Sequence, residues 1–193
     1  MSYLLSLDAS STTVGYSIWN KDTRELVEMN FYNMKSPIIL EKADEFERLI
    51  IQLKEKYPQL DEMIIEDAMM AMFGGMSSAH TTTLLNQVNI LYRDICKLKG
   101  LKVNTITVIE SRKKAFPMVK LRPKKIAGGM SHKEQIFEVV VKVLGAEMFP
   151  TKEMKSGKRK GETVFVDEAK DMADSYVVGL GFLNKTQNET KKL

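Results

Sequence analysis

The sequence predicts an α/β protein built on a mixed sheet, and three observations lead to that class. Short apolar runs over residues 3–7, 14–19 and 26–32 are separated by short polar segments, which is typical of an antiparallel meander. From residue 41 onward, helical and strand patterns alternate, which adds strands to the same sheet and packs helices against it. The chain of 193 residues has no internal repeat, so residues 1–193 are expected to form a single domain.

Periodicity and capping residues define the remaining elements. Apolar residues recur at helical spacing until Pro58 ends one pattern, and Gly100 ends a second. Ser131 begins a third helix, because Glu134 completes a capping box. The predicted elements are, in chain order, a helix over residues 41–57, a strand over 62–67, a helix from Ser77 or Ser78 to Leu98, a strand over 101–109, a helix over 131–144, a helix over 167–183 and a frayed tail over 184–193.

Positive charge gathers in two segments that are predicted to be irregular loops, residues 110–130 and 151–163, although the net charge is only +4. Such charge runs are ordinarily solvated faces, but two long basic segments also favour contacts with nucleic-acid phosphates. Contacts of this kind position a nucleic acid without choosing its sequence. The residues expected here to bind DNA are Arg112, Lys113, Lys114, Lys120, Arg122, Lys124, Lys125 and Lys133, and the second segment carries Lys152, Lys155, Lys158, Arg159 and Lys160.

The composition excludes several classes of protein. A hydrophobic fraction of 44% and a charged fraction of 28% are typical of a globular protein in water. No apolar run approaches the roughly 18 residues of a membrane helix, and the N-terminus lacks a secretion signal. The single cysteine, Cys96, cannot form an internal disulfide, which fits a reducing compartment. We therefore expect a cytoplasmic protein with no membrane partner and no organic cofactor.

Four carboxylates stand at positions where strands end or a helix begins. Asp8 closes the first strand, Glu66 closes the fourth, and Asp171 and Asp174 share one face of the last helix. If the two strands are neighbours and the helix crosses their ends, all four side chains converge. The alternative is that each has a local role, as a turn residue, a strand-end residue or a helix N-terminal acid.

Convergence of these carboxylates would require a cation. Two carboxylates about 4 Å apart repel by roughly 4 kcal/mol at an effective dielectric constant near 20. Hard divalent cations with oxygen ligands resolve such repulsion, and Mg²⁺ is the usual choice where phosphate is bound. Two such ions can activate a water molecule and stabilise the leaving oxygen of a phosphodiester.

Four motifs, in this order along the chain, resemble those of RuvC-type Holliday junction resolvases, which have the ribonuclease H-like fold. "LSLDASSTTVGYSIW" resembles the first strand and hairpin, in which Gly-Tyr follows the strand-end Asp as Gly15 and Tyr16 follow Asp8. "IIEDAMMAMF" is similar to the second motif, whose Glu ends the fourth strand. "SHKEQIFEVVVKVL" resembles the helix that carries a catalytic Lys, and "KDMADSYVVGLGF" resembles the final motif, two acids spaced D-x-x-D.

The resemblance implies a mixed five-stranded sheet, with three antiparallel strands first and helices on both faces. It also implies that Asp8, Glu66, Asp171 and Asp174 bind two Mg²⁺ ions, for which Mn²⁺ would substitute, and that Lys133 is a further catalytic residue. The implied reaction is hydrolysis of phosphodiester bonds in Holliday junctions or other branched DNA, which leaves a 5′-phosphate. A homodimer, formed across the helix that ends before Gly100, would cut two strands symmetrically.

The chain also departs from the family pattern. Ser10 stands where the family often has Gly, and Met69 stands where it has a phenylalanine that stacks on a base. Met69 and Phe73 are the residues predicted to contact bases in its place, with Met70 and Met72 as further candidates. The long basic loops predict a broader specificity for branched DNA. Compact divergent members are typical of bacteriophages, so a phage origin and a bacterial host cytoplasm are expected.

Two other functions remain open. A nuclease of the same fold could act on RNA–DNA hybrids instead of branched DNA. A non-catalytic binder of structured DNA could use the basic loops alone, although such a protein would gain affinity by losing negative charge near phosphate. Sugar and acetate kinases share a similar opening, but they need a second half for which 193 residues leave no room.

Overall fold

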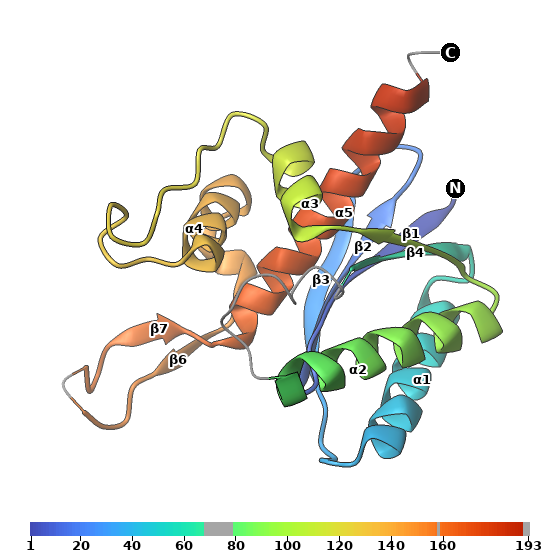
Figure 1. Ribbon diagram of the computed structural model, residues 1–193, viewed down its shortest axis with the longest axis horizontal. Helices are drawn as coiled ribbons and strands as arrows, with labels where there is room; N and C mark the ends of the chain where they lie inside the picture. The colour runs from blue at the N-terminus through green and yellow to red at the C-terminus, as the bar shows by residue number, and fades with distance from the viewer. Residues whose placement is uncertain (68–78, 158, 191–193) are drawn as a thin grey trace.

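The computed structural model describes residues 1–67, 79–157 and 159–190, and it contains one five-stranded sheet, a separate hairpin and five α-helices within that part of the chain (Figure 1). The elements are β1 (Tyr3–Ala9), β2 (Thr13–Asn20), β3 (Leu26–Asn33), α1 (Ile39–Lys56), β4 (Leu60–Glu66), α2 (Ala79–Leu98), β5 (Lys102–Ile106), α3 (Val108–Ala115), α4 (His132–Leu144), a 3₁₀ turn (Ala146–Met148), β6 (Thr151–Glu153), β7 (Thr163–Phe165) and α5 (Glu168–Thr190).

The sheet has the strand order β3-β2-β1-β4-β5 and is mixed, as predicted. The first three strands pair antiparallel, whereas β1 pairs parallel with β4 and β4 pairs parallel with β5. Leu7 lies opposite Ile65, so β1 and β4 end at the same edge of the sheet. This pairing brings the strand-end residues Asp8 and Glu66 to neighbouring positions.

Helices cover both faces of the sheet, which confirms the predicted fold class (Figure 1). Leu5 and Leu7 point into the core beneath α1 and α2, whereas Leu4 points into the core beneath α3, α4 and α5. Ile64 of β4 points into the same core as Leu4, beneath α3, α4 and α5. Because both faces are buried, β1 and β4 have nearly continuous apolar sequences instead of an alternating pattern.

Small residues allow α5 to approach the sheet closely. A Cβ atom on Gly179 would lie 2.1 Å from the Trp19 Nε1 atom, so only glycine fits there. The indole N–H of Trp19 donates to Ser17 Oγ at 2.9 Å, and Ser17 donates to the backbone oxygen of Ser175 at 3.1 Å. The bond from Ser17 to Ser175 joins β2 to α5, and because it is buried, it favours this position of the helix on the strand.

Two segments predicted to be irregular contain regular structure. The fifth strand ends at Ile106, and α3 occupies the start of the segment 110–130. Thr107 caps α3 by accepting a hydrogen bond from the Glu110 N–H, and Ser111 is buried against α5. Residues 116–131 hold no helix or strand, in agreement with the prediction for the rest of that segment.

The segment 151–163 was predicted to be a loop, but β6 and β7 pair antiparallel at its two ends. The last helix was predicted to end at residue 183, yet α5 continues to Thr190, so residues 184–190 are helical. The capping box of Ser131 and Glu134 is present as predicted. Within the described part of the chain, no helix is both long and apolar enough to cross a lipid bilayer.

Candidate active site

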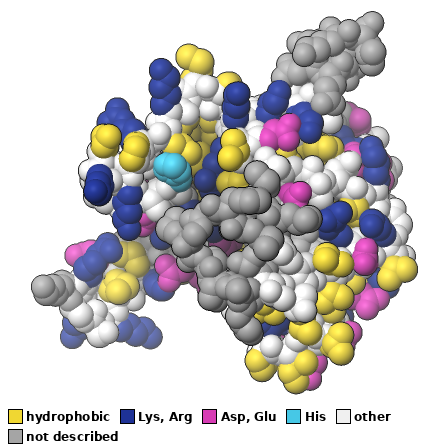
Figure 2. All heavy atoms as spheres, in the orientation of Figure 1, with side chains coloured by type: hydrophobic (Ala, Val, Ile, Leu, Met, Phe, Trp, Pro, Cys, Tyr) yellow, Lys and Arg dark blue, Asp and Glu magenta, His cyan; other side chains and the backbone are white. Residues whose placement is uncertain are grey.

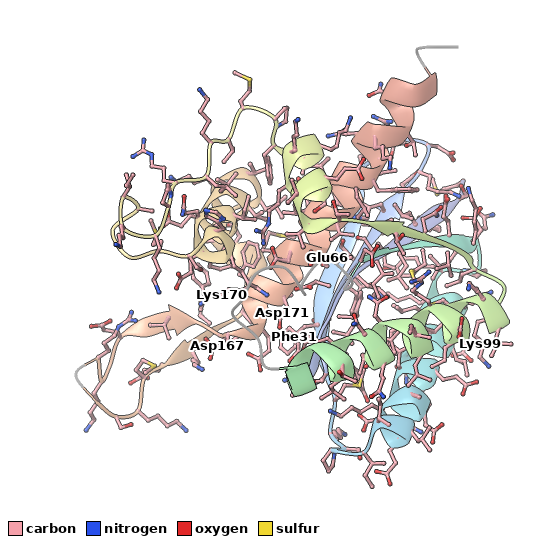
Figure 3. The ribbon with its side chains drawn as sticks, in the orientation of Figure 1. Phe31, Glu66, Lys99, Asp167, Lys170 and Asp171 are labelled. Atoms are coloured by element: carbon pink, nitrogen blue, oxygen red, sulfur yellow. The ribbon has the colours of Figure 1, made fainter. Side chains whose placement is uncertain are left out.

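Four carboxylates meet at the edge of the sheet where β1 and β4 end. Asp8 is near the end of β1, Glu66 is the last residue of β4, and Asp171 and Asp174 lie near the start of α5. Figure 3 labels Glu66 and Asp171, which reach this edge from the sheet and from the helix. The predicted convergence is explained by the parallel pairing of β1 with β4 and by the path of α5 across β2 and β1.

The backbone of β2 determines where the helix carboxylates lie. Gly15 pairs with Asp8 across β1 and β2, and a Cβ atom at this position would lie 2.1 Å from the backbone oxygen of Asp171. Glycine is therefore required for α5 to lie directly on the strand beside Asp8. The Gly-Tyr pair noted in the sequence thus has a structural reason: it allows the close approach that brings Asp171 and Asp174 to the strand end.

Lys133 lies among three of the four carboxylates. Its Nζ atom is 2.7 Å from Asp171 Oδ1, 3.1 Å from Asp174 Oδ2 and 3.4 Å from Asp8 Oδ2. Burial alone would lower the pKa of Lys133, but the charges of Asp8, Asp174 and Asp171 outweigh it and raise the pKa, so the ammonium is fixed in its charged form. The capped start of α4 directs this side chain into the site.

Arg112 provides a second cation, from α3. Its Nη2 atom is 3.6 Å from Asp174 Oδ1, and only 19% of its side chain is exposed. Arg112 is among the residues predicted to contact DNA, and the sequence pattern does not predict its contact with Asp174. A Cβ atom on Gly181 would lie within 3.0 Å of the backbone of Ser111, so the glycine allows α3 to pack closely on α5 and brings Arg112 to Asp174.

Glu66 and Asp8 carry too little compensating charge to ionise at their ordinary pKa values. Burial, followed by the charges of Asp8 and Asp174, raises the pKa of Glu66 to about 8. Burial also raises the pKa of Asp8 to about 7, with the Lys133 charge opposing this shift and Asp174 adding to it. Both carboxyl groups would therefore gain from a further cation nearby.

The residues of this site have the chemistry of a hard divalent cation site. The four acidic side chains outnumber the two nearby cations, Lys133 and Arg112, and their donor atoms are all carboxylate oxygens, which Mg²⁺ prefers. Among the described residues, no three carboxylate, imidazole or thiol groups form a preassembled metal cage. The Lys133 ammonium lies instead among three of the carboxylates.

The remaining residues predicted to bind DNA lie outside this cluster. Most of those in α3 and in the segment before α4 are exposed to solvent, as the basic side chains in Figure 2 illustrate. Lys114 is half-buried. Met69 and Phe73 lie outside the described residues. The exposed set is Lys113, Lys120, Arg122, Lys124 and Lys125.

No protein-family model and no curated protein sequence matches the chain. Solved structures do match it, at low sequence identity. RuvC of Thermus thermophilus, in complex with a Holliday junction substrate, superposes with a TM-score of 0.61 at 10% identity and covers 98% of both chains. The yeast mitochondrial Holliday junction resolvase has a TM-score of 0.58 at 12% identity, covering 98% of this chain and 81% of its own. The fowlpox virus Holliday junction resolvase has a TM-score of 0.52 at 10% identity, covering 95% of this chain and 99% of its own.

These superpositions extend over nearly the whole chain and include the mixed sheet and the helices on both of its faces. The four sequence motifs that resemble RuvC-type enzymes lie on β1–β2, β4, α4 and α5 of that shared framework. The chain therefore has the fold of the RuvC-type Holliday junction resolvases.

Proposed function

We propose that this protein is a Mg²⁺-dependent endonuclease that hydrolyses phosphodiester bonds in four-way or other branched DNA and leaves a 5′-phosphate. The observation that carries the proposal is the cluster of Asp8, Glu66, Asp171 and Asp174 around Lys133, on a fold shared with Holliday junction resolvases. A decayed, non-catalytic binder would have no reason to keep four carboxylates next to a phosphate-binding surface, because they repel DNA.

The four carboxylates would hold two Mg²⁺ ions per site, and Mn²⁺ would substitute for them. Bound metal would supply Lewis-acid activation of water and of the phosphodiester. Lys133 would stabilise negative charge that develops on the phosphate, since its ammonium already lies among the carboxylates and is held in the charged form. Arg112 acts as a positioning residue, because it contacts Asp174 instead of solvent.

Exposed basic side chains near the site would contact DNA phosphates. They project from α3 and from the segment between α3 and α4, which leads directly to Lys133. These contacts would position branched DNA without reading its sequence. Contacts from Met69 and Phe73 to the bases remain a prediction.

A homodimer formed across α2 would place two sites on one junction. Ile90 on α2 is 55% exposed, and Leu98 at the end of the helix is 84% exposed. A shallow apolar pocket of about 310 Å³, lined by Ile39 of α1 and by Gln87, Ile90 and Leu91 of α2, lies where the two helices meet. A second copy of the chain is the proposed occupant of this apolar face, because symmetric cutting of two strands needs two sites related by a two-fold axis. We place the assembly in the cytoplasm, of a bacterial host if the gene belongs to a phage.

Cleavage of an end-labelled synthetic four-way junction in Mg²⁺ tests the proposal. Wild-type protein should produce paired, symmetric nicks near the branch point that carry 5′-phosphates, whereas Asp8→Asn should produce none. A linear duplex of matched sequence is the control for structure selectivity. An RNA–DNA hybrid in the same assay tests the alternative substrate.

Each outcome decides between the candidate functions. Tight junction binding without nicks, in either Mg²⁺ or Mn²⁺, would replace the proposal with a structure-specific binder. Preferential cleavage of the hybrid would replace it with a hybrid nuclease. Analytical ultracentrifugation of the wild type, beside Ile90→Glu, tests the dimer: the wild type should sediment as a dimer and the variant as a monomer.

A further inference from the structure

The β6–β7 hairpin projects away from the sheet on the same side of the molecule as the start of α5 (Figure 1). Its strands pair from Thr151 with Phe165 to Glu153 with Thr163, and the Met154 N–H continues the ladder by donating to the Glu162 oxygen at 2.9 Å. Gly161 donates back to the Met154 oxygen at 2.9 Å. The segment is therefore a two-stranded ribbon whose pairing continues beyond its assigned strands to Met154 and Gly161.

The base of the hairpin is fixed to the core by aromatic side chains. Phe165 packs edge-on against Phe137 of α4, with ring centroids 5.2 Å apart, and lies 6.1 Å from Phe149. The Val166 N–H donates to the Pro150 oxygen at 3.1 Å and closes the base. Because α5 begins directly after this point, the ribbon and the helix that carries Asp171 share one rigid support.

The rest of the hairpin contributes nothing to the core. Among its described residues from 151 to 163, all but the half-buried Met154 are exposed. An isolated two-stranded hairpin is marginally stable in water, so the packing at its base must hold it in place. Because this segment buries so little surface against the rest of the protein, we expect it to have a role other than stabilising the fold.

The charge of the hairpin suggests that role. Its described residues include four basic side chains, Lys152, Lys155, Arg159 and Lys160, but only two acidic ones. Arg159 pairs with Glu162 at 2.6 Å. Within the described part of the chain, Lys155 and Lys160 form no ion pair, so two exposed ammonium groups near the tip are available to a partner.

We propose that the β6–β7 hairpin binds a duplex arm of the DNA substrate, outside the segment held at the carboxylate cluster. The inference rests on the proposed function. A two-stranded ribbon has the width that the major groove admits, and its lysines would contact the phosphates on the groove walls. Because the ribbon and Asp171 share one support, a duplex bound at the hairpin is held in a fixed position relative to the site of cleavage.

Site-specific cross-linking tests this proposal directly. Cys96 is the one cysteine of the chain, it is fully buried, and burial raises the pKa of its thiol to about 12, so it does not react. A Ser156→Cys variant therefore carries one reactive thiol at the hairpin tip, to which a photoactivated cross-linker is attached. Thr23→Cys, in the exposed turn between β2 and β3 at the opposite edge of the sheet, is the matched control.

The experiment is carried out in EDTA on a four-way junction with long arms, so that it reads binding and not cleavage. The tip variant should cross-link to duplex positions along one arm, away from the branch point, and the control should not. Absence of cross-links above the control, or cross-links confined to the branch point, would overturn the proposal. Nicking in Mg²⁺ is measured separately, so the hairpin can fail this test while the nuclease activity stands.

Affinity gives a second, independent measurement. Lys155→Gln with Lys160→Gln should weaken binding of the long-armed junction by about tenfold. The slope of log affinity against log salt concentration should become shallower by nearly two, because two phosphate contacts are lost. Lys97→Gln with Lys102→Gln removes the same formal charge far from the hairpin, at the end of α2 and the start of β5, where the two lysines pair with Asp94 and Glu62. This control should change the affinity less than about twofold, because charges far from the bound DNA are screened by salt. Equal losses in the two double variants would indicate a general charge effect and overturn the hairpin site.

Discussion

The two ends of β4 carry the same residue type in opposite electrostatic environments. Glu62, near the start of the strand, is contacted by Lys21 and Lys102, each at 3.1 Å, and accepts a hydrogen bond from Asn104 at 2.9 Å. Burial would raise the pKa of Glu62, but these three hydrogen bonds outweigh it and lower the pKa. At the other end, the pKa of Glu66 is raised to about 8.

This difference distinguishes a carboxylate whose charge is compensated within the protein from one whose charge is not, and it supports the proposal that Glu66 is a functional residue. Glu62 has its full set of partners within the protein, so it stabilises the fold and has no capacity for a ligand. Glu66 and Asp8 are left with excess negative charge beside the other carboxylates, an arrangement that costs stability unless something cationic is bound. The comparison can be tested by changing equivalent residues at the two ends of the sheet.

The largest expected effect is on cleavage of a four-way junction. Glu66→Gln should lower the rate in Mg²⁺ by about a thousandfold or more, because a carboxylate that would hold metal is lost. Glu62→Gln should leave the rate within about twofold of wild type, since it lies at the far edge of the sheet. Comparable losses in both variants would show that the two ends do not differ in function.

A smaller loss of cleavage activity is expected when the lysine that contacts the site carboxylates is replaced. Lys133→Met should lower the turnover rate of the junction by about a hundredfold, because the charge proposed to stabilise the transition state is removed. Lys21→Met, which removes a partner of Glu62, should leave turnover nearly unchanged. Single-turnover kinetics at saturating protein separate this loss from weaker binding. An unaltered rate in Lys133→Met would remove Lys133 from the catalytic residues.

The smallest expected effect is on stability, and it has opposite signs at the two ends. In EDTA, Glu66→Gln should raise the free energy of unfolding by about 1 kcal/mol, because a buried, under-compensated charge is removed. Glu62→Gln should lower it by about 1–2 kcal/mol, because charge-assisted hydrogen bonds are lost. Chemical denaturation at pH 8 measures both values, and the same sign in both variants would contradict the comparison.

The pH dependence of stability follows from the same pKa shifts. Asp8 and Glu66 have raised pKa values, so between pH 4 and 8 the folded protein binds more protons than the unfolded chain, and their contribution to stability falls as the pH rises. The lowered pKa of Glu62 acts in the opposite direction: its contribution is present above the ordinary pKa and is lost on acidification. Metal-free Glu66→Gln should therefore gain most over wild type at pH 8 and little at pH 5.

Much of the fold and the site followed from local sequence patterns. Asp8 and Glu66 each end a short apolar strand, and neighbouring parallel strands necessarily bring such ends together. The position of Lys133 among the carboxylates was expected only through the family resemblance, since a Lys near a helix start ordinarily faces solvent. Its contacts with three carboxylates depend on how α4 packs against α5, which no local pattern encodes.

Other features could not be predicted for identifiable physical reasons. The helix α3 is short, and its buried face consists only of the small residues Ser111 and Ala115, so it produces almost no hydrophobic periodicity. The segment was predicted to be an irregular loop because it contains Pro117, Pro123 and a Gly-Gly pair, and the contact of Arg112 with Asp174 was not predicted. The strands β6 and β7 have three residues each and are largely exposed, so they lack the apolar alternation that identifies a strand.

Position 15 has a consequence for how mutations in this protein would be interpreted. A methyl group on Gly15 would collide with the backbone at Asp171 and push α5 away from β2, so that Asp171 and Asp174 would move together relative to Asp8. A search for catalytic residues by their reactive groups would pass over this glycine. Yet the spacing of the carboxylates depends on the absence of a side chain there, so we expect an alanine at position 15 to disrupt the site although every carboxylate is still present.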